Sequence, residues 1–360
     1  MESKNYNLKE ILSKFNIDTD IELYGNGHIN DTYLCETSPR FILQKINTNV
    51  FKDPDAVMEN ICNVTRHLRE KIKEAGGEAD RETLNVIPTR TGEIYYKHPD
   101  GAAFRMYKFI ESSVSYDVAE RPEILTYAGE AFGKFQRMLS DFPAQKLHET
   151  IVDFHNTPVR VKQLQEAMKN NVSGRLGSVQ DEVKFALDYS RYSSEITDAM
   201  ENGDIPLRVT HNDTKLNNVL FDEKTDKGVC VIDLDTVMPG SLLYDFGDAL
   251  RFGASSCAED ETDLDKVYFD LDKYEAFAKG FLGAVGADLT KKEAELLPLS
   301  ALLMTYECGI RFLADYINGD TYFKIHREHH NLDRARNQFA LVKDIEKKLP
   351  EMAKIAQKYI

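Results

Sequence analysis

One segment, residues 211–235, constrains the fold of this chain more than any other feature of its sequence. It opens with H-N-D-T-K-L-N-N, continues through the apolar run V-L-F, and returns through a second apolar run, V-C-V-I, that ends in D-L-D. Two short apolar runs separated by a turn are typical of a β-hairpin. Such a hairpin returns the carboxylate of Asp233 toward Asp213, which lies 20 positions earlier. The chain must therefore fold around a cluster of polar side chains.

These polar residues match the needs of phosphoryl transfer to a hydroxyl group. The reaction needs a carboxylate that orients the nucleophile and accepts its proton, oxygen ligands for Mg²⁺, and a cation near the phosphates. Asp213 and Asn218 are five positions apart, which is the offset in the protein-kinase catalytic loop H-R-D-x-x-x-x-N. We expect Asp213 to be the catalytic base, with Lys215 reaching the transferring phosphate. We expect Asn218 and Asp233 to bind the metal.

Two further aspartates, Asp235 and Asp245, are candidates for the metal-binding role. The triplet Asp245-Phe246-Gly247 matches the D-F-G of protein kinases by letter, but it lies 32 positions after Asp213 and does not end an apolar strand. We therefore keep Asp233 as the metal ligand, with Asp235 as a second candidate. Asp245 is expected to have a structural role, as a hydrogen-bond acceptor for backbone near the catalytic loop.

The hydrophobic pattern differs between the two halves of the chain. Between about residues 20 and 112, short apolar runs bounded by turn residues predict strands, with one helix over 53–76. Helical periodicity then dominates, over 121–140, 157–169, 178–202, 264–285, 291–317 and 333–358. The prediction is an α+β, two-lobed, protein-kinase-like fold. Its N-lobe, residues 1–112, carries an antiparallel sheet and binds nucleotide; its C-lobe, residues 113–360, is helical and binds substrate and magnesium.

The N-lobe is expected to hold the nucleotide phosphates. Protein kinases use a strand lysine for this purpose, paired with a glutamate of the following helix. Lys45, in the predicted strand FILQKI, fits the lysine, and Glu59 in the next helix fits its partner, with Glu70 as the other choice. The Gly25-Asn26-Gly27 turn does not complete the pattern G-x-G-x-x-G, so it predicts either a phosphate-binding turn or only a tight turn.

The predicted strand that leads into the C-lobe is expected to contact the adenine ring. We assign this contact to Tyr107, Phe109 and Ile110, where backbone hydrogen bonds would hold the base. ATP and Mg²⁺ are therefore the expected cofactors.

Composition excludes several classes of function. Lys and Arg total 45 and Asp and Glu total 60, a net charge of −15 that repels nucleic-acid backbones. No apolar run reaches the roughly 18 residues of a membrane span, and the polar N-terminus is unlike a signal peptide. The five cysteines form no C-x-x-C pair, which predicts neither a disulfide framework nor a zinc site. We expect a cytoplasmic protein with a small-molecule substrate and no nucleic-acid or membrane partner; the sequence gives no oligomeric state.

Several longer strings resemble a known family. H-N-D-T-K-L-N-N-V-L followed by V-I-D-L-D is similar to the aminoglycoside and choline phosphotransferase family, with Asn212 where that family often has Gly. The strings G-N-G-H-I-N-D-T-Y at 25–33 and V-I-D-L-D-T-V-M-P-G at 231–240 resemble the N-acetylhexosamine 1-kinases of this family. D-F-G-D-A-L-R-F-G-A at 245–254 and C-G-I-R-F-L-A-D-Y at 308–316 extend the resemblance over most of the chain.

The resemblance implies a reaction and a set of substrate contacts. These kinases use ATP and magnesium to phosphorylate the anomeric 1-hydroxyl of N-acetylglucosamine and N-acetylgalactosamine. By this resemblance Asp213 would be the base for that hydroxyl. The sugar or its acetamido group would be contacted by His28, Asn30, Arg311 and Tyr322. The sequence does not rank the two sugars.

Arg311 also has an interpretation that needs no substrate. It lies in the largely apolar predicted helix 291–317, where a buried arginine needs a partner. Glu307 and Asp315 lie four positions before and after it, so an intrahelical ion pair is the alternative.

Two other functions compete with the sugar kinase. The net negative charge favours a cationic acceptor such as choline or an aminoglycoside, although Arg311 would repel it and the chain has no Trp for an aromatic cage. The second alternative is a kinase fold that binds ligand without turnover. The complete set of expected catalytic residues in this sequence argues against it.

Overall fold

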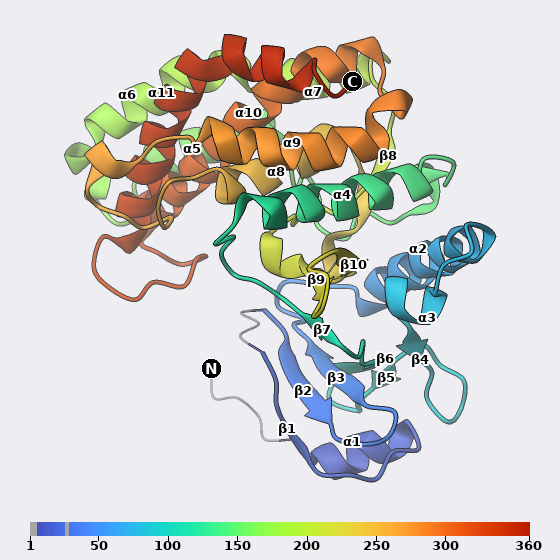
Figure 1. Cartoon of the computed structure of the whole chain (residues 1–360). Helices are drawn as coiled ribbons and strands as arrows, with labels where there is room; N and C mark the ends of the chain where they lie inside the picture. The colour runs from blue at the N-terminus through green and yellow to red at the C-terminus, as the bar shows by residue number, and fades with distance from the viewer. Residues whose placement is uncertain (1–5, 26–28) are drawn as a thin grey trace.

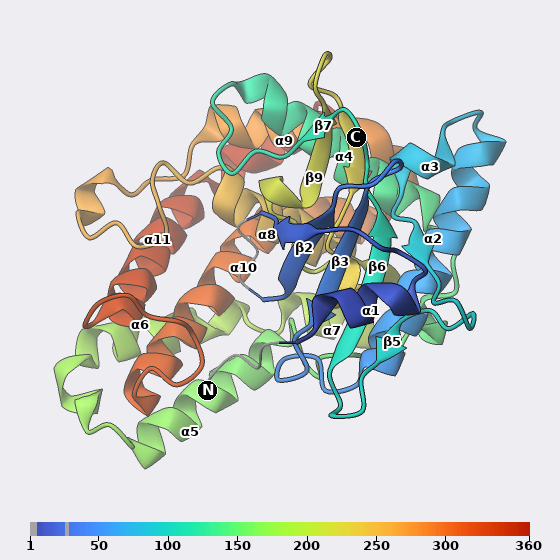
Figure 2. The same cartoon turned by 90° about the horizontal axis from the view of Figure 1, so that it is seen from below.

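The computed structural model describes residues 6–25 and 29–360. In Figure 1 the lobe built on a β-sheet lies below the larger helical lobe, and Figure 2 shows both lobes from below. This arrangement confirms the predicted α+β fold, with an antiparallel sheet near the N-terminus and helices toward the C-terminus. Among the predicted site residues, His28 lies outside the described residues.

The sheet lobe contains six antiparallel strands in the order β1-β2-β3-β6-β4, with β5 also paired to β6. The strands are β1 (Ile21–Leu23), β2 (Asp31–Cys35), β3 (Phe41–Ile46), β4 (Val86–Ile87), β5 (Tyr96–Lys97) and β6 (Ala103–Lys108). Each is short and rich in β-branched or aromatic residues, which suits a half-buried pleated surface. The two longest, β3 and β6, form the centre of the sheet.

The register of β3 on β6 divides the side chains between two faces of the sheet. Residues directly opposite one another in an antiparallel pair share a face. Leu43 lies opposite Met106 and packs into a small core with Leu12 of α1 (Leu8–Lys14). Gln44 lies opposite Arg105, so this pair is on the other face, away from α1.

Helix α2 (Pro54–Glu74) connects the sheet lobe to the helical lobe. Its N-cap is Asp53, whose side chain accepts a hydrogen bond from the Ala56 amide, and Pro54 suits the first helical turn. Its buried apolar residues recur at helical spacing: Val57, Ile61, Val64, Leu68 and Ile72. Between them lies Asn60, whose Nδ2 donates to the carbonyls of His148 (2.8 Å) and Val237 (2.9 Å). A short helix, α3 (Ala79–Glu82), follows.

Five further short strands lie outside the main sheet. They are β7 (Ser113–Val114), β8 (Arg208–Thr210), β9 (Val219–Asp222), β10 (Gly228–Val231) and β11 (Met238–Gly240). β9 and β10 form the expected hairpin, β7 pairs with β9, and β11 pairs with β8. The hairpin brings residues 211–218 and 233–235 to the side of the helical lobe that faces the sheet (Figure 1).

Eight helices build the helical lobe. They are α4 (Pro122–Met138), α5 (Thr157–Asn170), α6 (Gln180–Tyr189), α7 (Glu195–Glu201), α8 (Leu242–Gly253), α9 (Leu271–Val285), α10 (Lys291–Asn318) and α11 (His330–Ala356). The predicted helix 178–202 is two helices, α6 and α7. Sequence analysis predicts no helix at α8, whose residues Leu242–Arg251 are all buried, including Asp245, Asp248 and Arg251.

Close helix contacts explain several glycines of this lobe. A Cβ on Gly280 of α9 would lie 1.9 Å from the carbonyl oxygen of Thr126 in α4. A Cβ on Gly247 would lie 2.4 Å from the carbonyl oxygen of Ser300 in α10. The glycine of the D-F-G triplet is thus explained by helix packing.

Helix α10 is the central helix of this lobe. Its length of 28 residues and its apolar composition would suffice to cross a membrane, but 83% of its most apolar window is buried inside the fold. A mostly buried helix of this kind is the core helix of a globular lobe.

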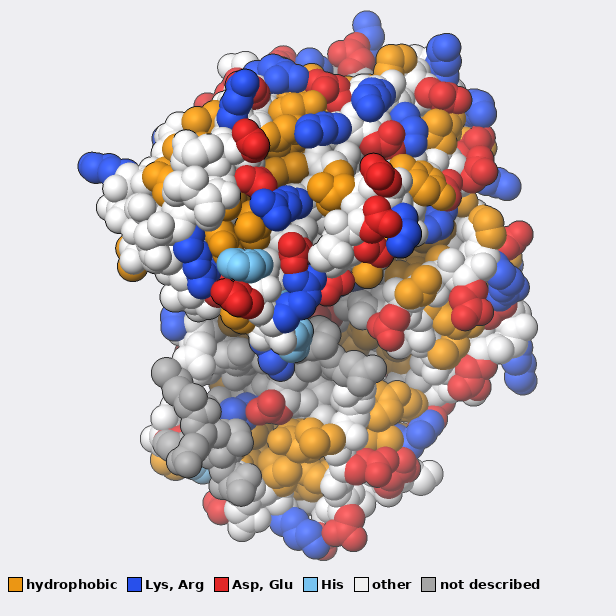
Figure 3. Space-filling view, turned by 90° about the vertical axis from the view of Figure 1, so that its left-hand side faces the viewer, with side chains coloured by type: hydrophobic (Ala, Val, Ile, Leu, Met, Phe, Trp, Pro, Cys, Tyr) orange, Lys and Arg blue, Asp and Glu red, His pale blue; other side chains and the backbone are white. Residues whose placement is uncertain are grey.

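The surface carries charges of both signs. On the face seen in Figure 3, Lys and Arg side chains alternate with Asp and Glu side chains over both lobes. The net charge of −15 is therefore not gathered into one acidic patch on this face.

Candidate active site

Asp245 of α8 holds the backbone of the catalytic loop. Its carboxylate accepts hydrogen bonds from the amides of His211 (2.9 Å) and Asn212 (2.8 Å) and from Nε2 of Gln136 (2.6 Å). Burial raises the pKa of Asp245, and these interactions oppose the rise. The predicted structural role of Asp245 is confirmed.

Asn212 occupies the position where the related family often has Gly. Its φ is 64°, in the left-handed region that Gly adopts freely and Asn tolerates better than other residues. Its Nδ2 donates to the carbonyl of Thr236 at 2.8 Å. The backbone conformation is the reason why both residues suit this position.

The two predicted catalytic residues, Asp213 and Lys215, and the predicted metal ligand Asn218 lie together after Asn212. Nδ2 of Asn218 donates to Oδ2 of Asp213 at 3.1 Å and to the Asp213 carbonyl at 2.7 Å, which leaves Oδ1 of Asn218 to face a metal. Nζ of Lys215 lies 2.6 Å from Oδ1 of Asp213. Burial opposes the charge of Lys215, but the neighbouring Asp213 outweighs it and raises the pKa of Lys215.

Asp233 lies two residues after β10, with its backbone in the left-handed region at a φ of 59°. Burial, followed by the charges of Asp235 and Asp213, raises the pKa of Asp233 to about 7. A divalent cation would remove this cost of burial. Magnesium is commonly held by one or two carboxylates plus substrate phosphates. Asp233 and Asn218 fit this pattern, although the described residues contain no cluster of three or more His, Cys, Asp or Glu able to hold a metal alone.

Asp235 contacts the sheet lobe at two points. One carboxylate oxygen accepts from Nη1 of Arg105, and the pair is almost fully buried, with side-chain exposures of 4% and 1%. The other accepts from Nδ2 of Asn30 at 2.7 Å. Oδ1 of Asn30 accepts from the amide of Asn47 at 2.9 Å. Asn30, predicted to contact the sugar, thus links β3 to Asp235 in this structure.

The predicted pairing of Lys45 with Glu59 is wrong. Nζ of Lys45 pairs with Asp31 at 3.1 Å, while the Glu59 carboxylate accepts from His148 at 2.9 Å. Glu70 does not pair with Lys45 either. The reason is strand parity: Lys45 shares the α1 face of the sheet, whereas its neighbour Gln44 is on the face that meets Asp235 through Arg105.

The three predicted adenine contacts lie where the sheet lobe ends. Tyr107 is buried, with the Arg105 guanidinium 5.2 Å from its ring centre. The amide of Phe109 donates to the Arg40 carbonyl at 3.0 Å, and Ile110 is buried in the main core. Their role in binding adenine remains a prediction.

A buried His–Glu pair lies beside the catalytic loop, on the helical lobe. Nδ1 of His155 is 2.9 Å from Oε1 of Glu307, and its Nε2 is 3.3 Å from the Asn212 carbonyl. The other Glu307 oxygen accepts from Thr157 at 2.7 Å. Burial raises the pKa of Glu307, but His155, the charge of Arg311 and the hydrogen bond from Thr157 together lower it below its ordinary value.

Two arginines, Arg160 and Arg311, lie near this pair, and neither forms a salt bridge with a carboxylate among the described residues. Arg311 has its guanidinium 5.8 Å from the ring centre of Phe154 and 5.5 Å from that of Phe323. No direct salt bridge joins Arg311 to Glu307 or Asp315; Glu307 pairs with His155 instead, although the charge of Arg311 still lowers the pKa of Glu307. Burial lowers the pKa of Arg160, and the nearby charge of Arg311 lowers it further. Nε of Arg160 is buried and has no hydrogen-bond partner among the described residues.

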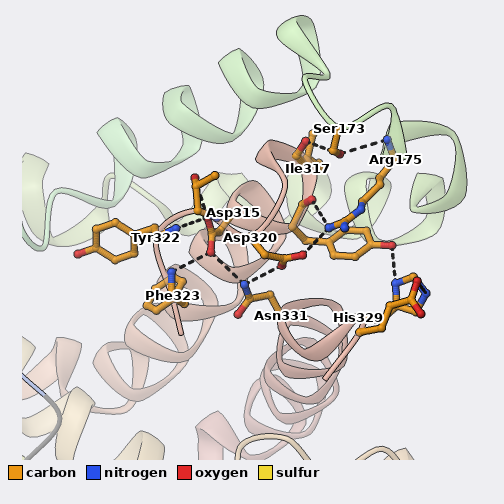
Figure 4. Close-up of polar contacts among 12 residues, drawn as sticks. Ser173, Arg175, Asp315, Ile317, Asp320, Tyr322, Phe323, His329 and Asn331 are labelled. Carbon is orange, nitrogen blue, oxygen red and sulfur yellow. Dashed lines mark hydrogen bonds and ion pairs between the residues drawn. The ribbon is translucent and has the colours of Figure 1, made fainter. Parts of the chain in front are cut away.

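The segment after α10 presents Tyr322 beside these arginines. The buried carboxylate of Asp315 accepts from the amides of Thr321 (2.9 Å), Tyr322 (2.8 Å) and Phe323 (2.9 Å) and from Nδ2 of Asn331 (2.9 Å). Figure 4 shows this network, with the ring of Tyr322 pointing away from it. Tyr322 is 68% exposed as a residue, so its backbone is held by Asp315 while its side chain is accessible.

Sequence reasoning missed three residues of this region. The predicted strand AAFRMYKFI contains two cations, Arg105 and Lys108, each with hydrophobic neighbours on both sides, so the sequence pattern does not single out Arg105. Arg160 and His155 come from a predicted helix and the loop before it, and their sequence context gives no signal.

Comparison with known proteins agrees with this geometry. The sequence model of a family described as "Phosphotransferase enzyme family" matches residues 20–279. A microcompartment-associated aminopropanol kinase has a TM-score of 0.64 at 15% identity, over 96% of this chain and 98% of that chain. An aminoglycoside phosphotransferase from Alicyclobacillus acidocaldarius has a TM-score of 0.63 at 12% identity, over 99% and 98%. An amicoumacin kinase in complex with AMP-PNP and Ca²⁺ has a TM-score of 0.60 at 13% identity, over 95% and 94%. At these identities the structures establish the fold alone.

Proposed function

Since the chain belongs to the phosphotransferase enzyme family, we propose that it uses ATP and Mg²⁺ to phosphorylate the anomeric 1-hydroxyl of N-acetylglucosamine and N-acetylgalactosamine. The nucleotide would bind residues 1–112 and the sugar residues 113–360, a division supported by β7, which leaves the sheet lobe to pair with β9. The resemblance of the sequence strings to N-acetylhexosamine 1-kinases supports the acceptor.

The proposed mechanism is direct, in-line transfer of the γ-phosphoryl group. Asp213 orients the sugar 1-hydroxyl and accepts its proton as the oxygen attacks phosphorus. An anomeric hydroxyl is more acidic than an ordinary alcohol, so a carboxylate is a sufficient base. Asn218 and Asp233 would hold Mg²⁺, which neutralises the phosphates, and Lys215 would leave Asp213 for the transferring phosphoryl group. Positioning and electrostatic stabilisation then supply most of the acceleration.

The observation that carries the choice of acceptor is the pair Arg160 and Arg311. Both guanidiniums lie in the helical lobe near His155, which contacts the catalytic loop through the Asn212 carbonyl. The nearest carboxylate, Glu307, is already hydrogen-bonded to His155 and Thr157. The guanidiniums of Arg160 and Arg311 favour a substrate that carries hydrogen-bond-accepting oxygens, such as the acetamido carbonyl, and they disfavour a cationic substrate.

A cationic acceptor is the second candidate. The net charge of −15 favours it, and the aminopropanol kinase of similar fold is named for an amine substrate. Arg160 and Arg311 weigh against it. Arg160 donates only to Gln163 and to the Phe154 carbonyl, and neither arginine forms a salt bridge among the described residues. A quaternary or primary amine would therefore meet positive charge where it needs carboxylates or an aromatic cage.

The test is ATP consumption, with Mg²⁺, against N-acetylglucosamine, N-acetylgalactosamine, glucose, choline and kanamycin. We expect turnover of the two N-acetylhexosamines and a sugar 1-phosphate product identified by ³¹P NMR. Preferred turnover of choline or kanamycin would refute the acceptor and leave the transfer centre intact. Asp213→Asn, run in parallel, separates true transfer from contaminating ATPase activity.

A further inference from the structure

Lys45, the lysine expected to contact the nucleotide phosphates, lies on the face of the sheet that packs against α1. Lys45 lies opposite Asp31 on one side and Phe104 on the other, and Phe104 belongs to the core under α1. The next residue back, Gln44, takes the opposite face and lies opposite Arg105 of β6. On the face that meets the catalytic hairpin, the cation of these two central strands is therefore Arg105.

The guanidinium of Arg105 is fixed by contacts on every side. Its Nε and Nη2 donate to Oε1 of Gln44 at 3.0 and 2.8 Å, and its Nη1 donates to Asp235. Burial opposes the charge, but Asp235 and its surroundings raise the pKa of Arg105, so it stays protonated. Its side chain is only 1% exposed. A buried arginine is costly unless it is paired, so the pair with Asp235 is required for this placement.

The partner, Asp235, is two residues after the metal-ligand candidate Asp233 in the D-L-D segment. The charges of Asp213 and Asp235 both act on Asp233, so three carboxylates lie close together at the proposed phosphotransfer centre. Lys215 compensates one of them from the helical lobe, and Arg105 compensates another from the sheet lobe. Without Arg105 the centre would repel a nucleotide anion more strongly.

We propose that Arg105, and not Lys45, is the cation of the sheet lobe that the phosphotransfer centre depends on, and that it acts as a positioning residue by neutralising and orienting Asp235 beside Asp233. Nucleotide binding is then weakened whenever Asp235 is left without Arg105, so the effects of substituting these two residues are coupled. This inference holds for any acceptor, so it does not depend on the choice of sugar.

The test is calorimetric titration of the full chain with Mg-ADP, without acceptor, so that failure of the sugar proposal cannot affect it. Arg105→Met should weaken binding by about tenfold or more, because it leaves Asp235 unpaired. The matched control Lys45→Met should bind within about twofold of wild type. The double variant R105M/D235N should recover most of the lost affinity, because it removes the unpaired carboxylate as well.

Steady-state kinetics give a second readout. Arg105→Lys, which keeps the charge, should raise the KM for Mg-ATP less than Arg105→Met does, with the acceptor KM unchanged in both. Should Arg105→Met fail to fold, Arg105→Lys and Gln44→Leu, which loosens the guanidinium without removing it, are the variants to titrate. The proposal is overturned if these two bind Mg-ADP like wild type, if Lys45→Met binds as weakly as Arg105→Met, or if R105M/D235N recovers nothing.

Discussion

Two ion pairs supply positive charge to the same centre, one from each lobe, and they differ in exposure. Lys215 and Asp213 on the helical lobe have side-chain exposures of 39% and 20%. Arg105 and Asp235, between the lobes, have exposures of 1% and 4%. An ammonium on a flexible, partly solvated stem can exchange partners during a reaction, whereas a buried, three-bonded guanidinium cannot do so cheaply. We infer that the exposed pair acts in catalysis and that the buried pair sets the geometry in which it acts.

The largest expected effect comes from removing the carboxylate of the exposed pair. Asp213→Asn should lower kcat by about 10²–10⁴-fold, because it removes the base and the orienting charge. The free energy of unfolding should change by less than about 1 kcal/mol, since the lost ion pair is partly exposed. Stopped-flow or coupled ATPase assays and chemical denaturation measure the two quantities. A variant that keeps kcat within tenfold would contradict the assignment of the base.

Breaking the buried Arg105–Asp235 pair should lower the stability of the protein far more than Asp213→Asn does. Arg105→Met should lower the free energy of unfolding by about 3–5 kcal/mol, because it leaves Asp235 buried without a cation. Lys215→Met is the matched variant of the exposed pair and should cost about 1 kcal/mol or less. Urea denaturation followed by circular dichroism compares them. Equal losses of stability in the two variants would remove the distinction between the pairs.

A third cation, Arg311, forms no salt bridge within the part of the chain that the structure describes, so its substitution should affect neither ion pair directly. Arg311→Gln should raise the acceptor KM by about tenfold, the loss of one hydrogen bond to substrate, and leave the KM for Mg-ATP unchanged. Arg66→Gln, an exposed arginine of α2, is the control. Initial rates at varied sugar and varied ATP separate the two constants. An increase in the KM for Mg-ATP alone would place Arg311 at the nucleotide instead.

The smallest effect concerns the pH dependence of stability. The pKa of Asp233 is raised to about 7 in the folded protein, above its ordinary value of 3.8. A raised carboxyl pKa means that the folded state keeps a proton that the unfolded state has released. The stability that this group contributes is therefore complete below about pH 4 and is lost as the pH rises through 7.

We expect the metal-free protein to lose a few degrees of Tm between pH 5 and 8 relative to Asp233→Asn, whose side chain does not titrate. Differential scanning calorimetry in EDTA measures this difference. Parallel Tm curves for the two proteins would show that Asp233 is already ionised at pH 5. Added Mg²⁺ should stabilise the wild type more at pH 8 than at pH 5, because the metal competes with the proton.

The catalytic hairpin could be predicted from sequence because its information is local. Asp213, Asn218 and Asp233 are tied by a loop and one tight hairpin, so their spacing along the chain fixes their proximity. The order of sheet lobe and helices was also predictable from the change in hydrophobic period. Asp245 could be assigned a structural role because its position, away from the end of an apolar strand, excluded the metal role.

The sheet lobe could not be predicted in the same way. In FILQKI both sets of alternate residues mix polar and apolar side chains, so the pattern does not say whether Gln44 or Lys45 faces the hairpin. Only the register of β3 on β6 decides it, and register depends on contacts between distant residues. Arg105 was missed for the same reason, since its partner Asp235 is 130 positions away.

Asn60 and the Arg105–Asp235 pair have a consequence for how the molecule melts. Asn60 binds backbone at His148 and Val237, and Arg105 binds Asp235, so both reach from the sheet lobe into the helical lobe. The sheet cannot detach without exposing a buried amide and a buried ion pair together, which makes separate opening of one lobe costly. We expect a single cooperative unfolding transition, with amide exchange in β3 and in α8 following the same global event.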